Sequence, residues 1–156
     1  MLMAFASIGL TLWVTWQLEG GAAAVNEAGR MRMQTWRMAQ TLARADAQQI
    51  AGLAAQFDQS VSVLQTGDPA RPLLVPHDAL SQEAFAAVQR DWLELKARWT
   101  ALPGPGAELS GQQADAFVVR IDTFVSAIEH HLSRLTAILN AVQFVMVALT
   151  IGSAIA

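Results

Sequence analysis

The charged residues of this chain are confined to its middle, and this is the feature that most limits the possible folds. Met1 to Trp16 contains no charged side chain, and neither does Leu135 to Ala156. The stretch between them, Gln17 to Arg134, holds all 10 basic and all 13 acidic residues. Uncharged, apolar ends are typical of helices that cross lipid. We therefore expect one water-soluble domain, residues 17–134, between two transmembrane helices, residues 1–16 and 135–156.

The two apolar ends differ in length. As helices they would span about 24 Å for residues 1–16 and about 33 Å for residues 135–156, against roughly 30 Å of hydrocarbon. We therefore expect truncated spans and a longer parent protein. Trp13 and Trp16 suit the membrane–water boundary. The alternative is a signal peptide cleaved near Ala22–Ala24, but no basic segment precedes the apolar run.

Several function classes are disfavoured by residues that the chain lacks. Without cysteine there is no disulfide framework, thiolate metal site or thiol nucleophile. A net charge of −3 gives no reason to expect nucleic acid as a partner. We find no pattern of catalytic residues and expect neither catalysis, nor a cofactor, nor a metal in this region. The adjacent His130 and His131 point about 100° apart on a helix, which does not suit one metal ion. Met31, Met33 and Met38 fit a packed core better than a haem or copper site.

The middle of the chain has the periodicity of helices. Its apolar residues recur at spacings of three and four and do not alternate, which predicts an all-α domain. Proline and glycine mark two breaks, at residues 66–72 and 103–106. Between them, residues 80–101 form a one-faced helix that we expect to start near Asp78 or Ser81.

Two further boundaries complete the architecture. Ser110 and Gln113 have the spacing of a capping box, which predicts the start of a last helix that runs unbroken into the second apolar end. Residues 17–65 would be about 74 Å long as one helix, too long for a common bundle. A turn near residues 43–47 resolves this and gives an antiparallel four-helix bundle. Because the truncated ends suggest larger parts across the membrane, we expect an extracytoplasmic sensor and not a cytoplasmic loop.

Arg30, Arg32, Arg37 and Arg44 lie within fifteen residues, and they do not share a face. On a helical wheel, Arg32 lies in a stripe of mostly small residues, whereas the other three point to solvent. The stripe beside Arg32 is the natural face towards the bundle core. Its members are Met31, Thr35, Met38 and Leu42. The small residues that surround Arg32 are Val25, Ala28, Gly29 and Ala39, with Trp36 as the large exception.

The small stripe would let a second helix approach closely. If that helix is its copy in another subunit, a two-fold contact brings Arg32 near its symmetry mate, and the two guanidiniums repel unless an anion lies between them. A guanidinium matches small planar oxyanions, such as nitrate and nitrite, through paired hydrogen bonds. Gly29, one turn earlier, leaves backbone open to such an anion. The alternative is that Arg32 is one more surface cation lying over apolar neighbours.

Residues 26–37, Asn-Glu-Ala-Gly-Arg-Met-Arg-Met-Gln-Thr-Trp-Arg, resemble the signature of the NarX/NarQ nitrate and nitrite sensor histidine kinases. In that signature Asn, Ala-Gly, Arg-Met-Gln and a second Arg recur in this register. Residues 57–76 and the helix with Phe117, Asp122 and Val125 are similar to the wider PilJ-type sensing domain. The resemblance covers nearly the whole chain.

The resemblance implies a homodimeric four-helix sensor in the periplasm, held in the bacterial inner membrane by more than one span. Arg32 of each subunit would clamp nitrate or nitrite, with the backbone at Gly29 completing the site. Asn26, Trp36 and Arg37 are possible supporting residues. ATP, magnesium and a response regulator would belong to a kinase region outside this sequence, so the chain itself is not expected to be an enzyme. Arg30 and Trp36 depart from the family pattern, which bears on ligand preference.

Two other functions remain open from the sequence. One is a PilJ-type or chemoreceptor input domain, with the same bundle but a different ligand or output. The other is a structural or cofactor-carrying membrane bundle. The segment that follows Ala156 in a longer protein distinguishes them, since a phosphoacceptor-histidine helix indicates the kinase and a long methylatable coiled coil indicates the chemoreceptor.

Overall fold

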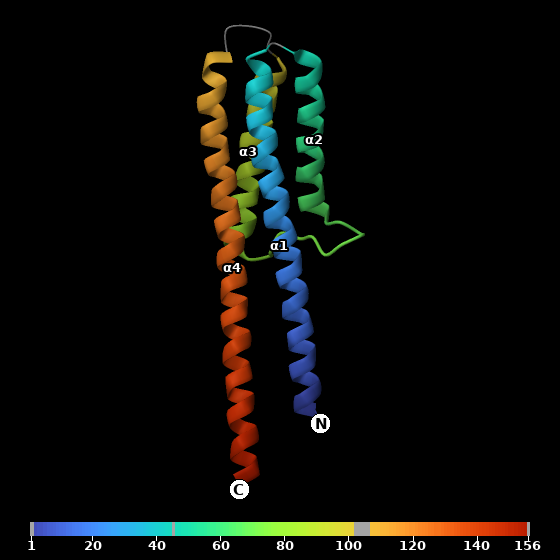
Figure 1. Cartoon of the computed structure of the whole chain (residues 1–156), viewed down its shortest axis with the longest axis vertical. Coiled ribbons are helices and arrows are strands. Elements are labelled where there is room, and N and C mark those ends of the chain that lie inside the picture. Colours follow the sequence, from blue (N-terminus) through green and yellow to red (C-terminus); the bar gives the residue numbers. More distant parts are fainter. Residues whose placement is uncertain (1, 45, 102–106, 156) are drawn as a thin grey trace.

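The computed structural model of the chain describes residues 2–44, 46–101 and 107–155 and is all-helical. Its helices are α1 (Leu2–Leu42), α2 (Ala47–Thr66), α3 (Ala79–Thr100) and α4 (Ala107–Ile155) (Figure 1). Across these three ranges no β-strand forms. The predicted all-α class is confirmed.

The helices run up and down in chain order. Each packs mainly against its neighbours in a ring, α1 on α2, α2 on α3, α3 on α4 and α4 on α1. Because α2 and α3 are shorter, α1 and α4 continue together past one end of the bundle, and both termini lie at that end (Figure 1). The last bundle helix and the second apolar segment are one continuous rod, as predicted.

Two of the predicted helix boundaries are confirmed, and each has a local cause. The turn near residues 43–47 falls between α1 and α2, where the Asp46 side chain caps α2 by accepting from the Gln49 N–H at 3.0 Å. Asp78 caps α3 in the same way through the Ser81 N–H at 3.1 Å. These side chains satisfy backbone donors that have no partner within a helix. The predicted break at 103–106 lies outside the described residues.

The predicted capping box at the start of the last helix is wrong. Helix α4 begins at Ala107, so Ser110 lies inside it, buried, with its hydroxyl donating to the Ala39 carbonyl at 3.4 Å. Gln113 accepts instead from the Trp99 indole N–H at 2.8 Å. A capping box needs its serine at the non-helical position before the first turn. Here the helix starts one turn earlier, and the two polar side chains contact α1 and α3.

Aromatic side chains form the centre of the bundle. The Trp92 ring stacks on Phe57 with ring centroids 4.1 Å apart, and Phe117 lies 5.6 Å from Phe57. The indole N–H of Trp92 donates to the Asp58 carboxylate at 2.8 Å. The cluster joins α2, α3 and α4 and satisfies its one polar hydrogen, as a buried tryptophan requires.

Below this core, α1 and α4 approach each other through a glycine. Gly21 is buried, and a Cβ atom built on it would lie 2.6 Å from Leu132 of α4. Its neighbour Gly20 faces the loop between α2 and α3, where a Cβ would lie 3.0 Å from Leu74. The absence of side chains at this pair therefore sets how closely α4 and the loop pack on α1.

One described helix has the length and apolar composition to cross a membrane, and the qualifying stretch lies within Leu109–Gly152 of α4. The apolar part of α1 does not qualify, so only one of the two expected transmembrane helices is supported. Large apolar side chains such as Phe144 and Ile138 are exposed along this end of α4. These features are consistent with a membrane-associated protein. The division into residues 1–16, 17–134 and 135–156 stays a prediction.

Candidate ligand sites along the first helix

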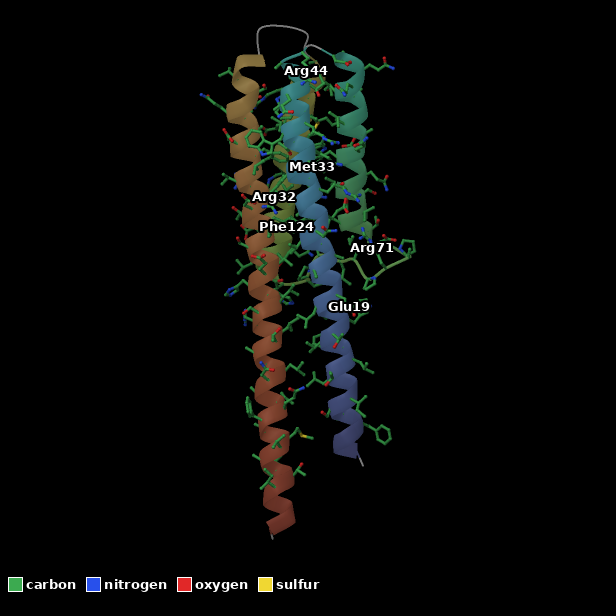
Figure 2. The ribbon with its side chains drawn as sticks, viewed as in Figure 1. Glu19, Arg32, Met33, Arg44, Arg71 and Phe124 are labelled. Atoms are coloured by element: carbon green, nitrogen blue, oxygen red, sulfur yellow. The ribbon has the colours of Figure 1, made fainter. Side chains whose placement is uncertain are left out.

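Arg32 faces α4, where it forms an ion pair. Its Nη1 donates to Asp122 Oδ1 at 2.7 Å, and the two side chains are 40% and 49% exposed (Figure 2). Its Nη2 lies on the Gly29 side, 3.8 Å from the position that a Cβ on Gly29 would occupy. Arg32 therefore joins α1 to α4 through one nitrogen, and its second terminal nitrogen lies beside uncovered α1 backbone.

The stripe around Arg32 is only partly available to a second subunit. Ala28 and Ala39 are buried within the bundle, at 0% and 5% exposure. Gly29 is half-buried and Trp36 is 39% exposed. The helical wheel predicted that these residues form one face open to a second subunit. This prediction is wrong for Ala28 and Ala39, because α4 packs against this side of α1.

The other assignments from the wheel can be checked by burial. The core face is confirmed, since Met31, Thr35, Met38 and Leu42 are all buried. Arg30, Arg37 and Arg44 are exposed, as predicted. The placement of Met33 in the core is wrong, because Met33 is 52% exposed. Asn26, one turn before Gly29, is exposed as well.

A groove of about 490 Å³ lies on the other side of α1, between α1, α2 and the loop at residues 67–78. Glu27 lies at its base, with a side chain only 4% exposed. Its carboxylate is 3.6 Å from Arg30 of the same helix and 3.6 Å from Arg71 of the loop. Arg37 also lines the groove. The sequence analysis missed Glu27 and Arg71, because no spacing rule connects a helix with a loop more than 40 residues away.

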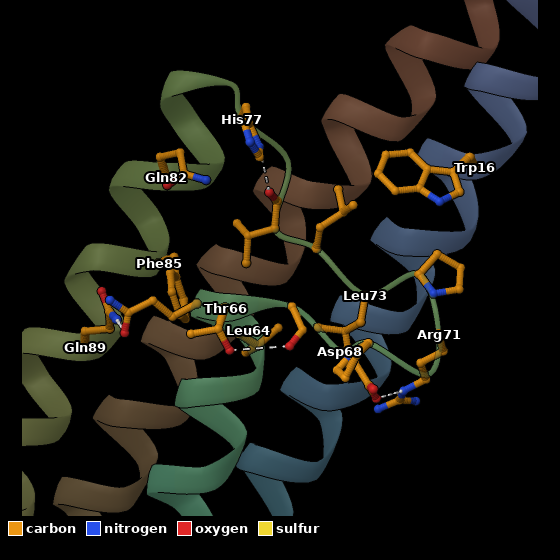
Figure 3. Close-up of a pocket in the computed structure, with 16 residues that line it drawn as sticks. Trp16, Leu64, Thr66, Asp68, Arg71, Leu73, His77, Gln82, Phe85 and Gln89 are labelled. Atoms are coloured by element: carbon orange, nitrogen blue, oxygen red, sulfur yellow. Dashed lines mark hydrogen bonds and ion pairs between the residues drawn. The ribbon is translucent and has the colours of Figure 1, made fainter.

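A wider pocket of about 870 Å³ is formed by the same loop with α2, α3 and Trp16 (Figure 3). Asp68 organises the loop by accepting from the Ala70 N–H and from Arg71, both at 2.9 Å. The Ala70 hydrogen bond, followed by the Arg71 contacts, holds the pKa of the Asp68 carboxyl below its ordinary value. His77 Nδ1 lies 3.3 Å from the Val75 carbonyl of its own loop. The loop thus supplies Arg71 to both cavities.

His131 is the one histidine that contacts an acidic side chain in the described part of the chain. Its Nδ1 lies 3.1 Å from Asp78 Oδ1 at the start of α3. Burial alone would raise the pKa of the Asp78 carboxyl, but the hydrogen bonds from Ser81 and the nearby imidazole of His131 hold the pKa below its ordinary value. Within the described ranges, no three His, Cys, Asp or Glu side chains are grouped to hold a metal ion.

Taken together, these features define a helical bundle with polar sites on its first helix and with its first and last helices leading away from it. A family model matches residues 13–117, and its description is PilJ, the N-terminal region of type IV pili methyl-accepting chemotaxis transducers. The chain belongs to this family, so it is a sensory input domain of the transducer type. No curated protein matches the chain significantly.

Proposed function

We propose that this sensory domain detects a small planar oxyanion, nitrate or nitrite, at Arg32 between two copies of α1. The observation that carries the proposal is the position of Arg32, which is half-exposed and bonded through Nη1 to Asp122 at 2.7 Å. A guanidinium has five donors in a fixed fork, so one carboxylate does not saturate it. The other terminal nitrogen, Nη2, lies 3.8 Å from the position that a Cβ on Gly29 would occupy, so the glycine leaves room beside it.

The dimer completes the site. Two Arg32 side chains facing each other across a two-fold axis would repel, and an anion that accepts from both offsets this repulsion. Gly29 and Trp36 lie about 60° and 40° around the helix from Arg32 and form the accessible part of this side of α1, whereas the exposed Asn26 lies about 120° away. Arg37 lies five residues beyond Arg32, hence about 140° around the helix, where it lines the α1–α2 groove. The supporting roles of Arg37 and Asn26 from the family resemblance are therefore less favoured than that of Trp36.

The proposed signalling mechanism follows from the ion pair between Arg32 and Asp122. Its partner Asp122 is on α4, and α1 and α4 are the two helices that run on past the bundle. An anion that competes with Asp122 for the guanidinium loosens the contact between these helices and lets them shift. The shift is limited by the difference in affinity of the anion for the two arrangements.

Two kinds of downstream output domain fit this sensory domain. The signature at residues 26–37 favours a sensor histidine kinase, with ATP, magnesium and a response regulator acting at a separate kinase region. The PilJ family match equally favours a chemotaxis or pilus transducer. In either case we place the bundle in the periplasm of a bacterium, as part of a multi-pass protein of the inner membrane whose spans contact lipid.

Calorimetry on the purified 156-residue chain tests the proposal. Nitrate is expected to bind the wild type, whereas Arg32→Ala abolishes binding and Arg32→Lys weakens it, because an ammonium cannot reproduce the planar fork. Arg30→Ala is the matched control, since it removes the same charge two residues away on another face and should leave nitrate affinity unchanged. Undiminished binding by Arg32→Ala, or a large loss with Arg30→Ala, would place the anion elsewhere.

A further inference from the structure

We propose that the groove between α1 and α2 is a second ligand site, for a small carboxylic acid that carries an amino or hydroxyl group beside its carboxylate. The groove lies on the opposite side of α1 from the Arg32–Asp122 pair. Figure 2 shows Arg71 of the loop on the α2 side of α1 and Arg32 towards α4. The proposal is independent of nitrate sensing and rests on different residues.

The size and walls of the groove suit a small organic molecule. Its volume of about 490 Å³ falls within the roughly 300–1,000 Å³ of typical ligand pockets. Met33 and Val63 supply apolar surface, and Ser60 is buried at 2% exposure. The other lining side chains are polar or charged, so the groove suits a small ligand that is held mainly by hydrogen bonds and charge.

The cationic half of the groove has unused hydrogen-bond donors. In the described ranges, no ion pair or side-chain hydrogen bond engages the guanidinium of Arg37. Arg30 and Arg71 are each 3.6 Å from Glu27, close enough for charge attraction but longer than a hydrogen bond. Arg71 also donates through Nε to Asp68, a further acidic residue of the lining, but donors remain on all three guanidiniums of the groove. A carboxylate is the planar acceptor that matches them.

The acceptor half of the groove requires a donor from the ligand. Gln34 lines the groove at only 6% exposure, and its buried Oε1 has no hydrogen-bond partner among the described residues. A buried acceptor without a donor is unfavourable and rare in folded proteins. Glu27 adds a second buried acceptor beside it. A bare anion such as nitrate offers these oxygens nothing, whereas the N–H or O–H of an amino or hydroxy acid satisfies them.

Three probes with one carbon skeleton separate these requirements. We would titrate the purified full chain by calorimetry with L-valine, 2-hydroxy-3-methylbutanoate and 3-methylbutanoate. The three acids share the carboxylate and the isopropyl group and differ only in the amino group, the hydroxyl group or neither. We expect the amino and hydroxy acids to bind at least about tenfold more tightly than 3-methylbutanoate, because only they supply the donor. Equal affinity for all three probes, or binding of none, would overturn the proposal.

Variants assign the binding to the groove. Arg37→Ala is expected to weaken binding of valine at least about tenfold, while Arg90→Ala, which removes an exposed arginine on α3, leaves it unchanged. Gln34→Met keeps the length of the side chain without its acceptor, so it should abolish the preference for valine over 3-methylbutanoate. Thermal unfolding verifies that each variant is folded. Valine binding unaffected by Arg37→Ala would contradict the assignment.

The variant Arg32→Ala separates this site from the proposed nitrate site. It should leave the valine isotherm unchanged, because Arg32 does not line the groove. Loss of valine binding with Arg32→Ala would mean that valine occupies the Arg32 site, which overturns the second site. Failure to bind nitrate at all, with valine binding intact, would instead remove only the function proposed for Arg32.

Discussion

The four-helix part of the molecule and the two-helix part below it are held together by opposite kinds of side chain. In the bundle, Phe57, Trp92 and Phe117 interlock across three helices, with Phe57 and Trp92 stacked at 4.1 Å. Lower down, α1 and α4 meet where Gly21 lies against Leu132. Large interdigitated rings permit one arrangement, whereas a glycine contact leaves fewer obstacles to small shifts.

This difference indicates where a signal can travel. The Arg32–Asp122 pair lies on the same two helices, about 15 Å along α4 from Leu132, counting ten residues. A ligand at Arg32 acts on the contact between α1 and α4, whereas the aromatic cluster joins α4 to α2 and α3 and contains no ring from α1. We therefore expect α2, α3 and α4 to be the stable support and α1 to move against α4.

The largest effect should come from the aromatic cluster. Trp92→Ala is expected to lower the free energy of unfolding by about 3–5 kcal/mol, because a buried ring is lost and a cavity remains. Trp13→Ala is the matched control in the lower part, where the side chain is 51% exposed, and it should change stability little. Chemical denaturation monitored by circular dichroism measures both. Similar losses for the two variants would contradict the comparison.

The next effect should come from the glycine contact. Gly21→Val is expected to destabilise the protein by about 1–3 kcal/mol, because its side chain would meet Leu132 where a Cβ already lies at 2.6 Å. Gly52→Val in α2 is the control, since a Cβ there meets nothing within 4 Å. The same denaturation experiment reports the difference between the variants. No destabilisation by Gly21→Val would mean that α1 and α4 separate freely, with less contact than the structure indicates.

The helical part of the fold could be predicted from the sequence because its signals are local. Apolar spacing and the turn at residues 43–47 required only the geometry of single helices, and Asp78 has the cap chemistry of a helix start. Ser110 was misplaced because the Ser-x-x-Gln spacing of a capping box also occurs inside a helix, as it does here, where α4 begins at Ala107.

The residues of the candidate sites could be predicted only where they belong to a single helix. The wheel separated Arg32 from its three neighbours, but it could not show that Asp122, 90 residues away, is its partner. It also assigned Arg30 and Arg37 to solvent without the groove that Arg71 and α2 build around them. Contacts between elements depend on how the helices are rotated against each other, and a periodic pattern on one helix does not contain that information.

Substitution of Asp122 should change the stability of the protein only slightly and its nitrate affinity more strongly. Asp122→Asn is expected to lower the free energy of unfolding by no more than about 1 kcal/mol, since both partners of the ion pair are about half exposed. Nitrate affinity should rise severalfold, because the competing carboxylate charge is gone. Calorimetry measures the affinity and denaturation measures the stability. A fall in nitrate affinity would show that Asp122 supports the anion site and does not compete for Arg32.

The smallest effect concerns pH and the start of α3, which lies where the bundle gives way to the α1–α4 pair. The folded protein holds the pKa of Asp78 below its ordinary value of 3.8, so the charged form is favoured by folding. The resulting stability is present above about pH 4 and is lost as the pH falls through the lowered pKa. Asp78→Asn keeps a capping side chain but does not titrate. The stability difference between wild type and Asp78→Asn should therefore be constant between pH 5 and 6 and should shrink in acid, as followed by thermal unfolding. A difference that grows as the pH falls below 4 would mean that the cap favours the protonated carboxyl, against the hydrogen bond from Ser81.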